Sequence, residues 1–210
     1  MDASTWDERY AAAEMVWSAT PNQFVEAELI DLPPGRALDL AAGEGRNALW
    51  LAERGWQVTA VDFSQVGLDK GRSLQAAHPA GQEMHIDWVC ADALTWRPSA
   101  PDFTLALLAY LQLPSEQRHA VVRNAFTTLQ VGGMFFLVAH DSSNLLEGTG
   151  GPQDAGVLYT AEDVLADLDG ERFDVLRAER VSRVVPAADG HGGQASQVAH
   201  DCLVRLVRTA

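Results

Sequence analysis

The sequence predicts an α/β protein with a doubly wound, mostly parallel sheet, helices on both faces, and an antiparallel hairpin at its C-terminal end. Two observations carry this prediction. Strand-like apolar segments alternate with helix-like segments over residues 36–140, a pattern that favours parallel strands joined by crossover helices. Beyond residue 140 two long segments of alternating polarity follow one another, which is typical of a hairpin.

Seven segments have the character of strands. Gly132 and Gly133 mark the turn into the fifth of them, and the glycine-rich stretch 186–194 predicts the tip of the terminal hairpin. In chain order the expected strands cover residues 36–40, 57–62, 85–90, 103–109, 133–139, 173–185 and 199–207.

Three helices are expected between these strands, at residues 46–54, 65–77 and 115–129. Ser64 and Ser115 stand where a hydroxyl side chain commonly caps the second and third helix. Later in the chain, a loop at 147–156 leads to Thr160 and Asp163, which predict the capped start of a short helix.

The length of 210 residues allows a single domain with a sizeable core. We divide it into an N-terminal lid (1–30), a cofactor-binding core (36–140), and a substrate loop with the terminal hairpin (141–210). The aromatic residues of the lid have two interpretations. Trp6, Tyr10 and Trp17 fit the core stripe of a helix, and Tyr10 and Trp17 also fit an aromatic wall beside a bound cation.

Composition excludes several classes of protein. The net charge of −14 and the single lysine disfavour nucleic acid as a partner, because phosphate contacts need clustered cations. Neither a leader peptide nor a membrane-length apolar run is evident, so we expect a cytoplasmic protein without membrane contact, monomeric or homodimeric. The dispersed histidines predict no metal site, and Cys90 and Cys202 lie in apolar segments that predict burial in the core.

The most informative motif runs from Arg36 to Ala48. Here a strand ends near Asp39, Gly43 and Gly45 form a turn that leaves the backbone open to a ligand, and a helix N-terminus follows. Asp62 ends the next strand, where a carboxylate can accept both hydroxyls of a ribose. Together these features predict an adenosine-containing cofactor.

The charges beside the turn indicate which cofactor this is. Gly43, Gly45 and Ala48 also fit the dinucleotide fingerprint, so an NAD-dependent oxidoreductase is the alternative. Asp39 and Glu44, however, would repel a pyrophosphate and attract the ammonium and sulfonium groups of S-adenosylmethionine. The chain also lacks a Tyr-x-x-x-Lys pair, and a terminal hairpin does not suit the dinucleotide fold. We therefore predict S-adenosylmethionine.

These motifs resemble those of the class I S-adenosylmethionine-dependent methyltransferases, which have a Rossmann-like seven-stranded sheet. Within that class the chain looks most like the small tellurite-resistance and thiopurine-type methyltransferases. The resemblance covers nearly the whole chain and is carried by Trp6-x-x-x-Tyr10, Val16-Trp17, Pro21-Asn22-x-Phe24, the Asp39–Ala48 motif, Val58–Asp62 and Leu113–Arg118. Gln112 departs from it, since several relatives are expected to have a histidine there.

The resemblance implies a cofactor site. In it, the backbone of Gly43 and Gly45 contacts the methionine part, and Asp39 anchors the turn and the ammonium. Asp62 takes the ribose hydroxyls. Around the adenine it implies Phe63 against the ring and Asp92 with the backbone of Ala93 at its edge; a turn residue is the lesser alternative for Asp92. The other residues expected at the cofactor are Trp17, Ala41 (where many methyltransferases have glycine), Asn47, Ser64 and Leu108.

The implied reaction is in-line methyl transfer to a small-molecule thiol, chalcogen or phenol-like acceptor. Positioning of the reactants alone can supply about 7–11 kcal/mol of such a barrier. A hydroxyl acceptor also gains from a base, for which His140 is the first candidate and Asp141 or Tyr110 the second. Two alternatives stay open: His140 and Asp141 could simply cap a loop, and the chain could be an inactive, S-adenosylmethionine-binding regulatory protein.

Overall fold

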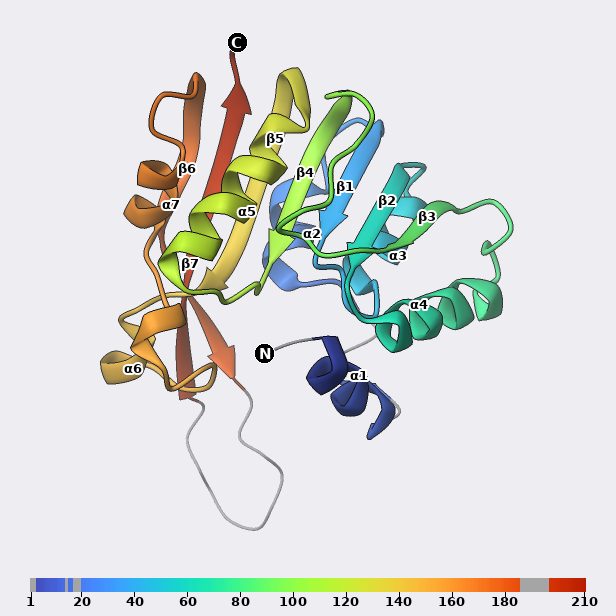
Figure 1. Cartoon of the computed structure of the whole chain (residues 1–210), viewed down its shortest axis with the longest axis horizontal. Helices are drawn as coiled ribbons and strands as arrows, with labels where there is room; N and C mark the ends of the chain where they lie inside the picture. The colour runs from blue at the N-terminus through green and yellow to red at the C-terminus, as the bar shows by residue number, and fades with distance from the viewer. Residues whose placement is uncertain (1–2, 14, 17–19, 186–196) are drawn as a thin grey trace.

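A computed structural model describes residues 3–13, 15, 16, 20–185 and 197–210. It contains a seven-stranded sheet with the order β3-β2-β1-β4-β5-β7-β6 (Figure 1). Strands β1 to β5 are parallel, and β7 is antiparallel to both of its neighbours, β5 and β6. The predicted fold class is therefore confirmed. The strands are β1 (Arg36–Leu40), β2 (Gln57–Asp62), β3 (His85–Cys90), β4 (Phe103–Ala109), β5 (Leu129–His140), β6 (Phe173–Val185) and β7 (Gln197–Arg208).

The helices between the strands agree closely with the predicted ranges. The described elements are α1 (Ala3–Ala11), α2 (Gln23–Leu29), α3 (Arg46–Glu53), α4 (Gln65–Ala77), α5 (Ser115–Thr127), α6 (Asn144–Glu147), a 3-10 turn η1 (Ala155–Val157) and α7 (Ala161–Asp167). The predicted hairpin tip at 186–194 and Trp17 lie outside the described residues.

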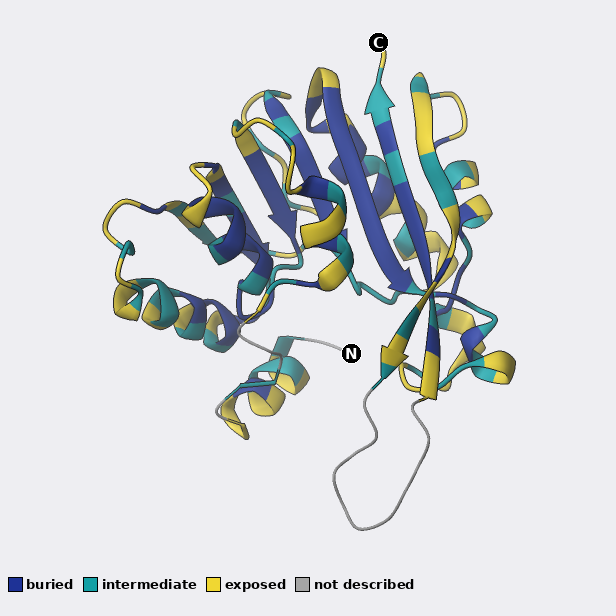
Figure 2. Ribbon diagram, turned by 180° about the vertical axis from the view of Figure 1, so that it is seen from behind, coloured by how far each residue is buried: buried dark blue, intermediate teal, exposed yellow. Residues whose placement is uncertain are grey.

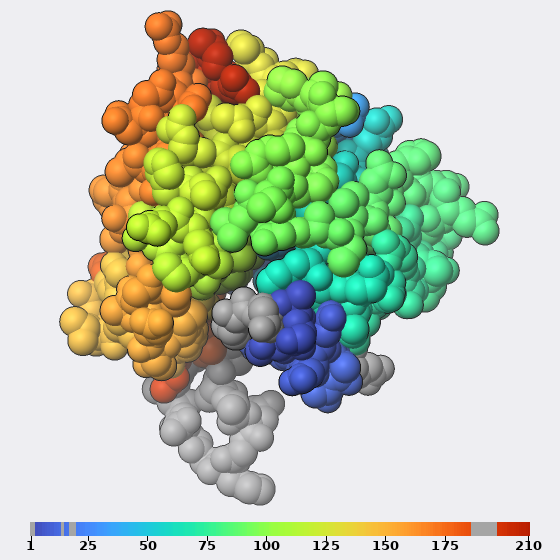
Figure 3. Space-filling model, viewed as in Figure 1, coloured from blue at the N-terminus to red at the C-terminus, as the bar shows by residue number. Residues whose placement is uncertain are grey.

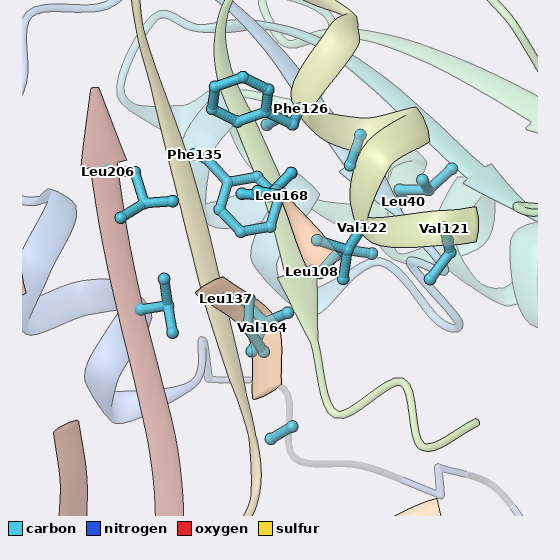
Figure 4. Close-up of a cluster of buried hydrophobic side chains, with 14 of the residues drawn as sticks. Leu40, Leu108, Val121, Val122, Phe126, Phe135, Leu137, Val164, Leu168 and Leu206 are labelled. Carbon is cyan, nitrogen blue, oxygen red and sulfur yellow. The ribbon is translucent and has the colours of Figure 1, made fainter. Parts of the chain in front are cut away.

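Two apolar layers cover the two faces of the sheet. On one face, Val25 and Leu29 of α2 pack with Leu51 of α3 against the strands. On the other face, α5 and α7 bury side chains against β4, β5 and β7, among them Phe126, Val164 and Leu168 (Figure 4). Because both faces are covered, the central strands are buried along most of their length (Figure 2).

The helix starts show which local predictions hold. Ser64 accepts the amide of Gly67 at 3.1 Å, so its role as a cap is confirmed. Thr160 and Asp163 form a reciprocal capping box, as predicted. The prediction for Ser115 is wrong: it is the first residue of α5, and Pro114 occupies the cap position without a side-chain bond. The carbonyl of Pro114 already accepts Arg118 N at 2.8 Å, which moves the start of the helix back by one residue.

The segment expected to be a lid has two different parts. Helix α2 is a core helix, with Val25 and Leu29 fully buried. Helix α1 lies beyond the carboxyl ends of the parallel strands, against α4 (Figures 1 and 3). It is fixed there by Asp7, whose Oδ1 accepts Ser64 Oγ at 2.5 Å and Val66 N at 3.2 Å.

No helix in the described ranges is long and apolar enough to cross a membrane.

Candidate active site

The turn after β1 has an unusual backbone. Ala41, Gly43 and Gly45 all have positive φ, of 65°, 58° and 76°. For Ala41 this is a strained conformation, held in place because its amide donates to Val61 O at 2.8 Å. Gly45 also lacks room for a side chain, since a Cβ there would lie 2.3 Å from a ring atom of Trp88. The turn therefore keeps an open backbone at the carboxyl end of the sheet.

Asp62 ties this turn to the end of β2. One of its carboxylate oxygens accepts Gly43 N and the other accepts Ser64 N, both at 2.8 Å. Burial raises the pKa of this carboxyl, and the two amide bonds partly offset that effect. Asp62 thus has a structural role that the sequence did not predict, at the position expected for the ribose.

Asp39 is the residue whose environment points most directly to a ligand. It is 1% exposed, and its Oδ2 has no hydrogen-bond partner within the described part of the chain. Burial, and then the charge of Asp62, raise its pKa to about 7. A buried carboxylate oxygen without a partner is costly, and a cationic ligand group would satisfy it. The site therefore fits the ammonium of S-adenosylmethionine.

Glu44, the second acid of the motif, is used differently from the prediction. Its side chain is 1% exposed and lies 3.2 Å from Nζ of Lys70. Val16 N also donates to both of its oxygens, at 3.1 Å. This carboxylate is already paired with a cation of the chain, which reduces the attraction predicted between Glu44 and the cation of the cofactor. The predicted attraction then rests mainly on Asp39 and Asp62.

Two further predicted cofactor residues hold elements together. Asn47 is buried, and its Oδ1 accepts Asn22 N at 2.9 Å, which joins α3 to the start of α2. Ser64 caps α4 and donates to Asp7. Both lie close to the turn, so they support the site whether or not they touch a ligand.

The residues expected at the adenine lie at the carboxyl ends of β2 and β3. Phe63 is half-buried, and Asp92 is exposed with its Oδ1 accepting Leu94 N at 2.9 Å. Through this bond Asp92 stabilises the turn that follows β3, which is the alternative role that the sequence offers for it. The carbonyl of Ala93 accepts Nδ2 of Asn124 at 2.7 Å, and Leu108 is buried in the core.

The two cysteines differ in their surroundings. Cys202 is buried, and burial raises the pKa of its thiol. Cys90 is exposed, so the prediction that both are core residues is wrong. Cys90 is the last residue of β3, an edge strand in which no residue is fully buried.

A second polar cluster lies at the carboxyl ends of β4 and β5. Tyr110 follows β4 with a strained φ of 58°, and its ring centroid is 4.8 Å from that of His140 at the end of β5. Between them lies Asp201 of β7, which is fully buried. Its Oδ2 accepts Arg183 Nε at 2.7 Å and the hydroxyl of Tyr110 at 3.0 Å. Burial, and then the charge of Asp201, raise the pKa of Tyr110 to about 12.

Of the three predicted catalytic residues, the structure brings Tyr110 and His140 together. Asp141 is engaged elsewhere: its Oδ1 accepts the amide and the hydroxyl of Ser143 at 2.9 and 2.6 Å. Gln112 accepts His140 N at 2.9 Å and donates to Val157 O at 2.7 Å, so it links the segment after β4 to the end of β5 and to η1.

Sequence reasoning missed Asp201 and Arg183, which complete the cluster. Both lie in strands that alternate in polarity, where a single charged residue is an ordinary outward-facing position. Only the antiparallel pairing of β7 with β5, which places Asp201 opposite His140, reveals their role. Among the residues that the structure describes, no three His, Cys, Asp or Glu side chains gather as a metal site.

The fold is that of the class I methyltransferases. Three features define it: the sheet order, the reversed seventh strand, and a glycine turn beside two strands that each carry an acid near their carboxyl end. Residues 37–133 match a family model described as a methyltransferase domain. This match confirms the predicted class and, with it, S-adenosylmethionine as the cofactor that the family uses.

Curated relatives match over about half of the chain. Trans-aconitate 2-methyltransferase of Streptomyces coelicolor is 35% identical over 115 residues, covering 52% of this chain and 37% of that protein. tRNA 5-carboxymethoxyuridine methyltransferase of Escherichia coli K12 is 27% identical over 111 residues, covering 53% and 42%. The matched stretch thus spans less than half the length of each relative.

Solved structures match almost the whole chain in fold. A protein from a study of disulfide-to-thioacetal conversion in echinomycin biosynthesis has a TM-score of 0.73 at 18% identity, covering 99% of this chain and 92% of its own. N-methyltransferase NodS of Bradyrhizobium japonicum WM9, in complex with S-adenosylhomocysteine, has a TM-score of 0.71 at 18% identity, with 99% of both chains covered. TehB of Haemophilus influenzae has a TM-score of 0.68 at 16% identity, with 99% and 67% covered.

Proposed function

We propose that this chain catalyses S-adenosylmethionine-dependent methyl transfer to a small-molecule nucleophile by in-line displacement. One observation carries the proposal: Oδ2 of Asp39 is buried beside an open glycine turn and has no hydrogen-bond partner among the residues that the structure describes. A cofactor with a cation and no phosphate suits that position, whereas a pyrophosphate would be repelled by it. The family match over residues 37–133 supports the same conclusion.

Each predicted cofactor residue has a proposed role. Asp39 holds the ammonium, and the backbone of Gly43 and Gly45 contacts the methionine part. Asp62 accepts the ribose hydroxyls, and Phe63 lies against the adenine. The bound cofactor supplies a methyl carbon already activated by the sulfonium, so the chain has to orient the acceptor and exclude water. Asp92 and Ala93 border the adenine, and Trp17, Ala41, Asn47, Ser64 and Leu108 shape the site.

The acceptor is proposed to bind beside Tyr110 and His140. Ligands of open α/β sheets bind at the carboxyl ends of the strands, where both residues lie. His140 is the proposed base, because Tyr110 donates its hydroxyl to Asp201 and keeps its proton with a pKa of about 12. Asp141, already bonded to Ser143, stays the weaker candidate.

A small molecule is the proposed acceptor because the chain has a net charge of −14. The name of the trans-aconitate relative supports a small acceptor, while that of the tRNA relative supports the alternative. A nucleic acid would need clustered cations, which the scattered arginines do not provide.

The test is a methyl-transfer assay that follows S-adenosylhomocysteine production. The acceptor panel consists of thiols, phenols, tellurite and bulk tRNA, each with the wild-type protein and the Asp39→Asn variant. We expect turnover with at least one small acceptor, reduced at least 10-fold in the variant. Turnover with tRNA alone would overturn the small-molecule assignment, and binding of S-adenosylhomocysteine without any turnover would support the inactive regulatory alternative.

A further inference from the structure

Asp201 is a fully buried carboxylate whose two oxygens have different surroundings. Its Oδ2 accepts two hydrogen bonds, from Arg183 Nε at 2.7 Å and from the hydroxyl of Tyr110 at 3.0 Å. Its Oδ1 accepts none from the residues that the structure describes. Oδ2 of Asp201 is thus hydrogen-bonded to a cation and a hydroxyl, while Oδ1 can still accept a hydrogen bond.

The available oxygen lies next to the predicted base. Oδ1 of Asp201 is 3.2 Å from Nδ1 of His140, although the two atoms are not aligned for a hydrogen bond. Both atoms are buried, and neither has another partner in the described ranges. Buried polar atoms in folded proteins are nearly always paired, so these two are placed to satisfy each other after a small turn of the ring.

The imidazole ring of His140 is held from several directions. The ring of Tyr110 packs against it at 4.8 Å between centroids. Gly151 also lies against the ring, since a Cβ at that position would lie 2.8 Å from Cγ and Cδ2 of the imidazole. With Nδ1 3.2 Å from Asp201, Nε2 is the nitrogen left to exchange a proton with a substrate.

The charges around this pair come from several elements. Asp201 (β7) is the acid, Arg183 (β6) is its bonded cation, and Tyr110 after β4 is neutral. Arg46 at the start of α3 is close enough for its charge to act on Tyr110 and Arg183. An imidazolium formed at His140 would therefore lie 3.2 Å from a carboxylate, in a cluster that otherwise holds two guanidinium groups.

We propose that Asp201 is a positioning residue that holds His140 as a general base, and that the acceptor is accordingly a protic nucleophile, such as a phenol or another hydroxyl, rather than a preformed anion. This inference rests on the proposed function. In the reaction the acceptor gains the methyl group and gives up its proton to Nε2 of His140. The electron pair of the broken carbon–sulfur bond stays on sulfur, and Asp201 balances the imidazolium.

The experiment compares two acceptors of different chemistry in wild type and Asp201→Asn. One is a simple phenol, protonated at assay pH, and the other is an aromatic thiol that is fully ionised there. We expect Asp201→Asn to lower kcat for the phenol about 100-fold, the lower end of the usual contribution of a general base, with little change in KM. The rate with the thiolate should change less than about threefold, because it has no proton to lose.

The ratio of the two rates separates this role from a merely structural one, because a distorted site would slow the phenol and the thiolate alike. If the variant does not fold, His140→Gln offers the same comparison of phenol with thiolate.

Three results would overturn the inference: equal loss with both acceptors, unchanged turnover of the phenol in the variants, or wild-type protein that methylates the thiolate alone. Each of them leaves the proposed function intact. Failure of the wild-type protein to bind S-adenosylhomocysteine in calorimetry would instead defeat the proposed function itself.

Discussion

Nζ of Lys70 lies 3.2 Å from Oε1 of Glu44, a carboxylate only 1% exposed in the middle of the glycine turn. The same ammonium donates to the carbonyls of Tyr10 and Ala13, at 2.6 and 2.5 Å. The only lysine of the chain therefore joins the N-terminal segment, helix α4 and the cofactor turn. This contact explains how an acid can be buried inside the motif, because its charge is paired with an ammonium of the same chain.

Lys70→Met should destabilise the protein strongly, because it leaves the buried charge of Glu44 without its cation. We expect a loss of about 3 kcal/mol in the free energy of unfolding, the low end for a broken buried ion pair, since Lys70 is partly exposed. Urea denaturation measures the change. The double variant Lys70→Met, Glu44→Gln should recover at least half of it, and a single variant as stable as wild type would contradict the account.

The strained turn offers a substitution that should stabilise the protein. Ala41 has a φ of 65°, a conformation that costs a residue with a Cβ about 1–2 kcal/mol and costs glycine little. Ala41→Gly should therefore raise the free energy of unfolding by about 0.5–1 kcal/mol, after the entropy of the unfolded chain is counted. Its neighbour Ala42, without positive φ, is the matched control. Ala42→Gly should destabilise, and a loss of stability in both variants would argue against strain at Ala41.

Asp39 should make stability depend on pH. Its pKa of about 7 lies above the ordinary 3.8, so the folded chain binds the proton more tightly than the unfolded chain. Stability therefore falls as pH rises from about 4 to about 7, and the full cost is present above that range. Asp39→Asn should raise the free energy of unfolding at pH 8 by at most about 4 kcal/mol, and the difference should shrink toward pH 4. A constant difference across this range would contradict the assignment.

The same residue should make cofactor affinity depend on pH. Only the ionised carboxylate attracts the ammonium, so S-adenosylhomocysteine should bind wild-type protein less tightly as pH falls through about 7. Asp39→Asn should weaken binding about 10- to 100-fold at pH 8, the usual value of a charged hydrogen bond. Calorimetric titrations at several pH values provide the measurement. The variant should lose the pH dependence as well as the affinity.

Asp62→Ala should affect both the fold and the cofactor. The substitution leaves the amides of Gly43 and Ser64 without their acceptor, at a cost of about 1–3 kcal/mol for each buried group. Thermal unfolding and titration with S-adenosylhomocysteine should both reveal the loss. Asp92→Ala is the control, because Asp92 is exposed and its bond to Leu94 is local. Asp92→Ala should change the free energy of unfolding by less than about 0.5 kcal/mol while still weakening the binding of S-adenosylhomocysteine.

Much of the fold was predictable because local and global signals agree. The first four predicted strands match β1 to β4, and residues that disfavour strands bound three of them: Gly35 before β1, Asp62 at the end of β2 and Asp102 before β4. The fifth was predicted to start at Gly133, but β5 begins at Leu129 and continues through both glycines. The glycines lie where the register with β4 shifts, between the pairs Phe103–Leu129 and Leu105–Met134.

The site was less predictable, because it depends on contacts between distant residues. Asp201 lies 91 residues from Tyr110 and 18 from Arg183, and nothing in the local sequence of β7 distinguishes it from a surface acid. The place of Glu44 in the turn predicts a contact with the cofactor, and only the fold shows that Lys70 reaches this carboxylate. Such pairings follow from strand register and helix docking, which motif spacing does not contain.

The turn beside Asp39 is proposed to bind S-adenosylmethionine, and calorimetric titration of the purified protein checks this without knowledge of the acceptor. Separate titrations with S-adenosylmethionine, S-adenosylhomocysteine and NAD at pH 8 form the experiment. We predict that the first two bind at a single site and that NAD does not bind. Binding of NAD without S-adenosylhomocysteine would contradict the reading of Asp39 and, with it, the proposed reaction.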